Sequence, residues 1–225
     1  MIEVIFDKEL DKEVYLDFAD FSMAGADFGA RIRQDHPEIN HENFAAYVDR
    51  FYEANREELD RSADELRRKL NETQQAFFSA AREVFGVDYS NLKSVGVLSI
   101  FDCNPRYPEK NLFQVYYRRD LLGKMEVAYH ETLHFMFFRF CSEECADIIG
   151  DRDPNQGVYW ELSELFNVII LDQPVFRGIL KREELLFYPD LSDKLVVLKG
   201  LWVKREGNVR AFVTDALQEL EKTAR

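Results

Sequence analysis

The sequence is organised around residues 126–140, which read EVAYHETLHFMFFRF and contain a His-Glu-x-x-His pattern inside an apolar run. Because an α-helix has 3.6 residues per turn, His130 and His134 would project from one face, and both imidazoles could reach a single tetrahedral cation. Glu131 would be turned about 100° around the same axis, where it could reach a water on the metal without being a ligand. The pattern predicts two metal ligands and a general base on one helix.

The apolar character of this segment makes the pattern informative. The chain contains only four histidines, and two of them fall here. Polar side chains in such a helix need a partner, because burying them unpaired is costly. The alternative interpretation is a core helix with two hydrogen-bonded imidazoles and no metal.

With these residues the sequence resembles the HExxH zinc metallopeptidases, and within them the gluzincins. The resemblance covers residues 126–140 and 159–171. It implies one zinc ion per chain, a peptide or protein substrate, and hydrolysis by a metal-activated water with Glu131 as general base. The metzincins, which place a third His soon after the motif, are excluded because no His follows His134.

A catalytic zinc site holds three protein ligands, so a third ligand must lie downstream. Residues 158–171 are apolar except for four polar positions, and carboxylates are rarely buried without a partner. The resemblance, which implies a Glu on a following helix, favours Glu164, with Asn167 three residues later as a source of a supporting hydrogen bond. Glu161, one turn before Glu164, remains an alternative, and Asp147 is a weaker one. Val168 departs from the family, which has an Asp there to orient a ligand His.

Two further groups of residues have candidate roles. The resemblance implies a tyrosine or histidine that stabilises the transition state, and Tyr159 and Tyr188 are the candidates. Cys141 and Cys145 have the i, i+4 spacing of one helix face, but two thiols without a neighbouring His favour buried structural cysteines over a second metal site.

Composition limits the classes of partner and compartment. The chain has 225 residues, 46% of them hydrophobic and 14% aromatic, which is enough for a sizeable core. A formal charge of −13 argues against nucleic acid and anionic membranes as partners. The start of the chain is not a secretory signal, no run approaches the roughly 18 apolar residues of a membrane span, and three cysteines give no disulfide framework. We expect a soluble, cytoplasmic protein.

The hydrophobic patterns predict a mostly helical α+β fold. It has a small antiparallel or mixed sheet packed on a zincin-like active-site helix, with a helical N-terminal part. We expect a mainly helical part at 1–90 and a zincin-like core with C-terminal helices at 91–225, or one continuous domain over 1–225. The resemblance implies that strand 112–117 is the sheet edge that pairs with an extended substrate. The remaining expected strands are 2–6 and 93–101. Helices are expected within 44–84, around the His-Glu-x-x-His motif with an end at about residue 139, and at 158–171, 195–203 and 209–220.

Two functions of different classes follow. The first is a zinc-dependent peptidase; the second is a non-catalytic zincin-fold module that acts through protein contacts. A degenerate module has no need to keep a general base, so Glu131 favours the enzyme. A third interpretation, a helical interaction protein with a coincidental motif, predicts no bound metal. Zinc is inferred from the ligand types, and manganese, iron or cobalt would accept similar ligands.

Overall fold

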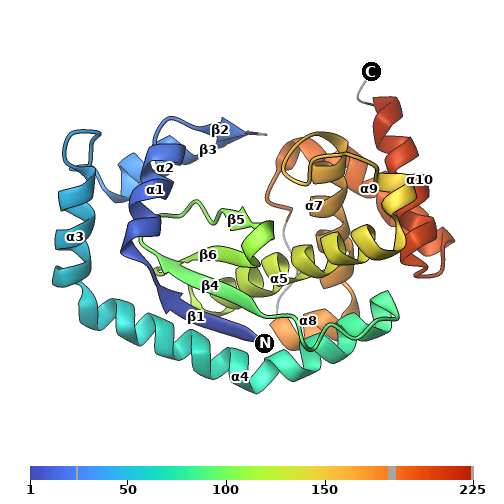
Figure 1. The fold of residues 1–225 in the computed structure, drawn as a ribbon, viewed down its shortest axis with the longest axis horizontal. Coiled ribbons are helices and arrows are strands. Elements are labelled where there is room, and N and C mark those ends of the chain that lie inside the picture. The colour runs from blue at the N-terminus through green and yellow to red at the C-terminus, as the bar shows by residue number, and fades with distance from the viewer. Residues whose placement is uncertain (24, 182–185, 224–225) are drawn as a thin grey trace. The chain divides into compact units, whose positions relative to one another are not determined.

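The computed structural model describes residues 1–23, 25–181 and 186–223, which group into two compact units (Figure 1). The first unit contains Met1–Gln74 and Lys93–Ala128, and the second contains Gln75–Leu92 and Tyr129–Arg225. Two helices, α4 (Arg56–Phe85) and α5 (Leu121–Glu144), contribute residues to both. The sequence-based division at residue 90 stays a prediction.

The first unit is built on a four-stranded sheet in the order β1-β4-β6-β5 (Figure 1). Strand β1 (Ile2–Phe6) and strand β6 (Leu112–Tyr116) both pair in parallel with β4 (Ser94–Ser99), whereas the short β5 (Arg106–Tyr107) is antiparallel to β6. The sheet is therefore mixed. Together with the helical majority, it confirms the predicted α+β class and the three predicted strands.

The prediction that strand 112–117 is a sheet edge is wrong. β4 pairs with one side of β6, and β5 covers the other side at Leu112 and Phe113. Gln114 also donates its backbone N–H to the Pro105 carbonyl at 2.9 Å. The cause is the segment 102–111, which folds back to form β5 and a 3-10 helix η1 (Pro108–Lys110). A two-residue strand is too short to leave a period-2 pattern in the sequence.

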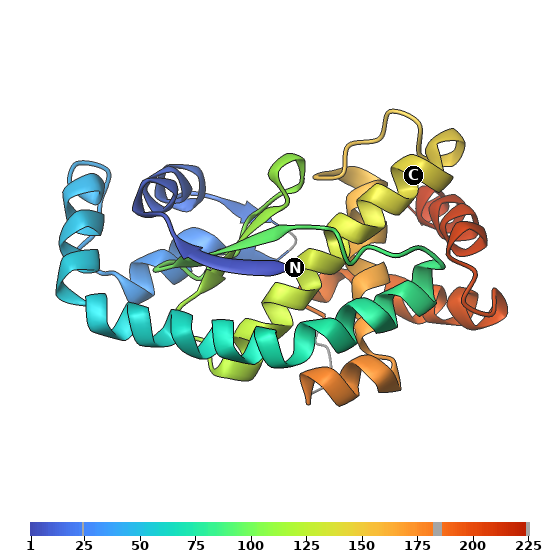
Figure 2. The same cartoon turned by 60° about the horizontal axis from the view of Figure 1, so that its bottom comes forward.

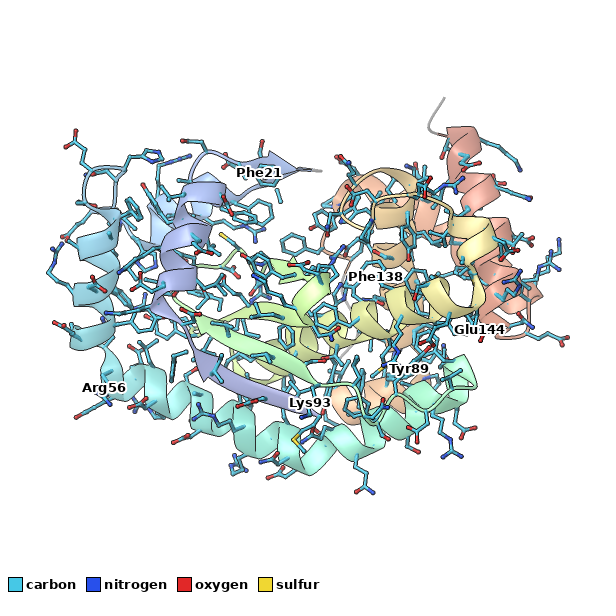
Figure 3. The ribbon with its side chains drawn as sticks, in the orientation of Figure 1. Phe21, Arg56, Tyr89, Lys93, Phe138 and Glu144 are labelled. Carbon is cyan, nitrogen blue, oxygen red and sulfur yellow. The ribbon has the colours of Figure 1, made fainter. Side chains whose placement is uncertain are left out.

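Three helices precede α4 in the described part of the first unit. Asp7 ends β1 and caps α1 (Lys8–Phe18) by accepting hydrogen bonds from the backbone N–H groups of the first turn. A hairpin of β2 (Ser22–Met23) and β3 (Ala26–Asp27) leads into α2 (Phe28–Asp35), and α3 (Phe44–Ala54) packs on α1 before α4 begins at Arg56, which Figure 3 labels. The predicted helices within 44–84 are confirmed as α3 and α4.

The second unit is entirely helical in its described part. Its centre is α7 (Gly157–Leu171), which lies beside α9 (Ser192–Lys204) and α10 (Val209–Thr223) in both views (Figures 1 and 2). The ring of Phe166 on α7 packs against other aromatic rings, those of Phe85, Phe137, Trp202 and Phe212. Short helices α6 (Ala146–Ile149), α8 (Pro174–Leu180) and η2 (Pro189–Leu191) connect the longer ones.

The motif helix α5 is longer than predicted. It was expected to end near residue 139 and instead continues to Glu144, which Figure 3 labels together with Phe138. No Gly or Pro interrupts residues 140–144, and Phe140 and Cys141 bury their side chains, so the last turn is held by packing. None of the helices in the described part of the chain is long and apolar enough to cross a membrane.

Candidate metal centre

Three side chains predicted as metal ligands converge in the second unit. His130 and His134 come from one face of α5, and Glu164 comes from α7. The two imidazole Nε2 atoms are 3.0 Å apart. Glu164 places Oε2 at 3.3 Å from the Nε2 of His130 and Oε1 at 3.5 Å from the Nε2 of His134.

These distances are compatible with one bound metal ion. Bonds of about 2.0–2.1 Å in tetrahedral geometry separate neighbouring ligand atoms by about 3.3–3.4 Å. The observed separations of 3.0, 3.3 and 3.5 Å lie around that value, and the two carboxylate distances end on different oxygens of Glu164. Two imidazoles and one carboxylate are also the donor set of a catalytic zinc site, which leaves one position for water. The group of three side chains could hold a metal ion.

The burial of the group also favours a cation. The His134 side chain is fully buried and that of Glu164 is 5% exposed, whereas His130 is 14% exposed. A carboxylate in such a position is costly unless a positive charge compensates it. A metal ion would supply that charge, and His130 is the ligand nearest to solvent.

Asn167 connects the two ligand-bearing helices. It lies one turn after Glu164 on α7, and its Nδ2 donates a 2.7 Å hydrogen bond to the backbone carbonyl of His130 on α5. The side chain is fully buried. Its Oδ1 accepts no hydrogen bond from any residue that the structure describes. This hydrogen bond reaches the backbone of a candidate ligand residue and not its imidazole, and the supporting role of Asn167 stays a prediction.

The alternative third ligands have other partners. Glu161 forms a 2.6 Å ion pair with Lys194 of α9. Asp147 lies at the surface and pairs with Arg210 at 2.8 Å. It is thus Glu164, and not Glu161 or Asp147, that the structure brings to the two imidazoles.

Glu131 follows His130 on α5 and is buried, with 7% of its surface exposed. Its position on the helix is the one that the motif requires, directly after the first ligand. Its role as general base stays a prediction.

The two candidate tyrosines occupy different environments. Tyr159, in the first turn of α7, is buried, and this burial raises the pKa of Tyr159 well above its usual value. Tyr188 is half-buried and sets its ring edge-on to Trp160, with centroids 4.9 Å apart. A role for either in stabilising a transition state stays a prediction.

Cys141, in the last turn of α5, and Cys145, directly after that helix, are both buried, as expected. Cys141 and Cys145 are fully buried and are not joined by a disulfide. The neighbouring Cys141 thiol lowers the pKa of Cys145, whereas burial raises that of Cys141. Among the residues that the structure describes, His130, His134 and Glu164 form the one group of three or more His, Cys, Asp or Glu side chains that could hold a metal ion.

Sequence reasoning missed one neighbour of the metal centre. Phe138, one turn after His134, stacks on the imidazole of that ligand. Its i+4 spacing was the available signal, but an aromatic residue in an apolar helix is usually part of the core.

Comparison of the chain with protein-family models, curated protein sequences and solved structures finds no match. The functional argument therefore depends on the geometry of the site.

Proposed function

We propose that this protein is a zinc-dependent metallopeptidase of the gluzincin type. The observation that supports the proposal is the convergence of His130, His134 and Glu164 at separations suited to one tetrahedral ion. Glu131, on the same helix as the two imidazoles, supplies the second requirement, a base beside the open metal position.

Each residue would have a distinct task. His130, His134 and Glu164 would hold the ion, and Asn167 would keep α7 at a constant distance from the His130 backbone. A bound zinc ion supplies a Lewis acid that polarises a carbonyl and acidifies a coordinated water. The Glu131 carboxylate would accept the proton of that water and then donate it to the nitrogen of the leaving amine.

The proposed substrate is a peptide or a protein. A formal charge of −13 disfavours nucleic acid as a partner. We place the protein in the cytoplasm because its three cysteines are not joined in disulfides, as is usual in a reducing compartment. Zinc is the proposed ion, at one per chain.

The first test is metal content. The wild type, purified without chelator, should carry about one zinc per chain. His134→Ala and Glu164→Ala should lose it, whereas the matched variant Glu161→Ala should keep it because that carboxylate pairs with Lys194. No zinc in the wild type, even after zinc is supplied, would refute the proposal.

The second test is hydrolysis of a mixture of unmodified peptides, followed by mass spectrometry. The wild type should cleave peptide bonds, and Glu131→Gln should retain zinc but lose cleavage by about 100-fold or more. Cleavage unchanged in Glu131→Gln would contradict the assignment of the base. Stoichiometric zinc without cleavage of any peptide would support the non-catalytic zincin-fold module that acts through protein contacts.

A further inference from the structure

The imidazole of His134 is held between two rings on its own helix. On one side the His130 ring meets it edge-on, with centroids 4.7 Å apart and planes at 76°. On the other side the Phe138 ring stacks nearly parallel to it, with centroids 5.6 Å apart and planes at 14°. Spacings of this size are typical of attractive ring pairs.

The Phe138 ring is in turn held by α7. Tyr159 meets it edge-on, with centroids 5.5 Å apart and planes at 71°. The Tyr159 ring also packs on Phe137 of α5, with centroids 6.1 Å apart. A continuous row of ring contacts thus runs from Tyr159 through Phe138 to the candidate ligand His134.

We infer that Phe138 is a positioning residue of the metal centre, which sets the ring orientation of His134, and that Tyr159 holds Phe138 in place. The inference rests on the proposed metal site. The terminal torsion of a histidine side chain has a broad energy profile, so its ring rotates unless neighbouring groups restrain it. A parallel ring against one face restrains this rotation and keeps Nε2 directed toward Glu164.

This inference gives Tyr159 a role different from transition-state stabilisation. Its side chain is buried, and its ring packs on Phe137 and Phe138. Tyr159→Phe keeps both ring contacts and removes only the hydroxyl. It should therefore leave zinc affinity within about twofold of the wild type, because the ring contacts that hold Phe138 remain.

The experiment compares two leucine substitutions on α5. Phe138→Leu removes the ring stacked on His134, whereas the control Phe140→Leu removes a more buried ring that packs on Phe85. Zinc affinity is measured by competition with a chelating dye, and ligand geometry by the visible absorption spectrum of the cobalt-loaded protein. Thermal unfolding of the metal-free variants reports folding separately.

We expect Phe138→Leu to weaken zinc binding by about 3- to 10-fold, the range that corresponds to loss of one aromatic pair. Its cobalt spectrum should shift, and Phe138→Tyr, which keeps the ring, should restore both the spectrum and the affinity. Phe140→Leu should lower the unfolding temperature and leave affinity and spectrum unchanged. If Phe138→Leu does not fold, Phe138→Met tests the same loss of the ring.

Two results would overturn the inference while the proposed function stands. One is a Phe138→Leu or Phe138→Met protein whose zinc affinity and cobalt spectrum equal those of the wild type. The other is an equal loss of affinity in Phe140→Leu, which would indicate a general effect of loosening α5. A wild type that binds neither zinc nor cobalt would instead remove the metal centre itself, so the two failures are distinguishable.

Discussion

Replacement of Asn167 by leucine should separate the stability of the protein from its metal affinity. Asn167 is fully buried, and it donates one hydrogen bond to the His130 carbonyl while its Oδ1 accepts none from the described residues. Leucine has a similar size and no polar atoms. The substitution therefore removes one hydrogen bond and one buried polar atom that is not satisfied.

The two effects on the free energy of unfolding have opposite signs. Loss of the hydrogen bond costs about 1 kcal/mol, whereas removal of an unsatisfied buried polar atom returns about 1–3 kcal/mol. The His130 carbonyl lies in the interior of α5, where it also accepts the intrahelical hydrogen bond from the backbone four residues later, so it is not left bare. We expect the metal-free Asn167→Leu protein to be as stable as the wild type or up to about 2 kcal/mol more stable.

Metal affinity should change in the other direction. Without the Asn167 hydrogen bond, α7 loses its polar link to the His130 backbone. Outer contacts of this kind typically change metal affinity by about 10- to 100-fold. We expect zinc binding to weaken by about tenfold.

The assays are urea unfolding with a chelator present and zinc titration against a competing dye. Ser163→Ala is the control, because Ser163 is a buried polar residue of α7 whose hydroxyl bonds within its own helix, to Trp160. It should leave zinc affinity unchanged. Unchanged affinity in Asn167→Leu, or equal weakening in Ser163→Ala, would refute the reasoning about the link between the helices.

Three further predictions concern the whole chain. Burial raises the pKa of Asp11 from 3.8 to about 6 in the folded protein. The protonated side chain therefore stabilises the fold below the pKa of the unfolded state, and this stabilisation is lost as pH rises through the pKa of the folded state. The free energy of unfolding of the wild type, minus that of Asp11→Asn, should therefore fall by about 2–3 kcal/mol between about pH 4 and pH 7. Urea unfolding at several pH values measures this difference, and a difference that rises with pH would contradict the prediction. Gly29→Ala should destabilise the protein by about 3 kcal/mol or more, measured by the same unfolding, because a Cβ there would lie 2.1 Å from the Ala19 carbonyl oxygen; tolerance of alanine would show that α2 can shift. Zinc at about 100 times its dissociation constant should raise the unfolding temperature by about 5–10 °C, measured by calorimetry, and should not do so in Glu164→Ala.

The sequence was most informative where the pattern is local. Strands at 2–6, 93–101 and 112–117 and the helices around residues 44–84, 158–171, 195–203 and 209–220 were all predicted from hydrophobic periodicity and were found. Helix α1 and the return of the chain through β5 were not, because the first has a mixed period and the second is two residues long. The prediction that β6 is an edge strand was wrong for the same reason, because its neighbour β5 leaves no pattern in the sequence.

The sequence by itself determined that His130, Glu131 and His134 share one helix at ligand spacing, because helical geometry depends only on neighbours along the chain. It could not decide between Glu161 and Glu164, which lie one turn apart on nearly the same face of α7. The tertiary structure decided this by placing Lys194 beside Glu161 and both imidazoles beside Glu164. The same packing of α7 on α5 brought Asn167 to the His130 carbonyl and Tyr159 to Phe138. Such contacts depend on how two helices are rotated and translated against each other, which periodicity within either helix does not specify.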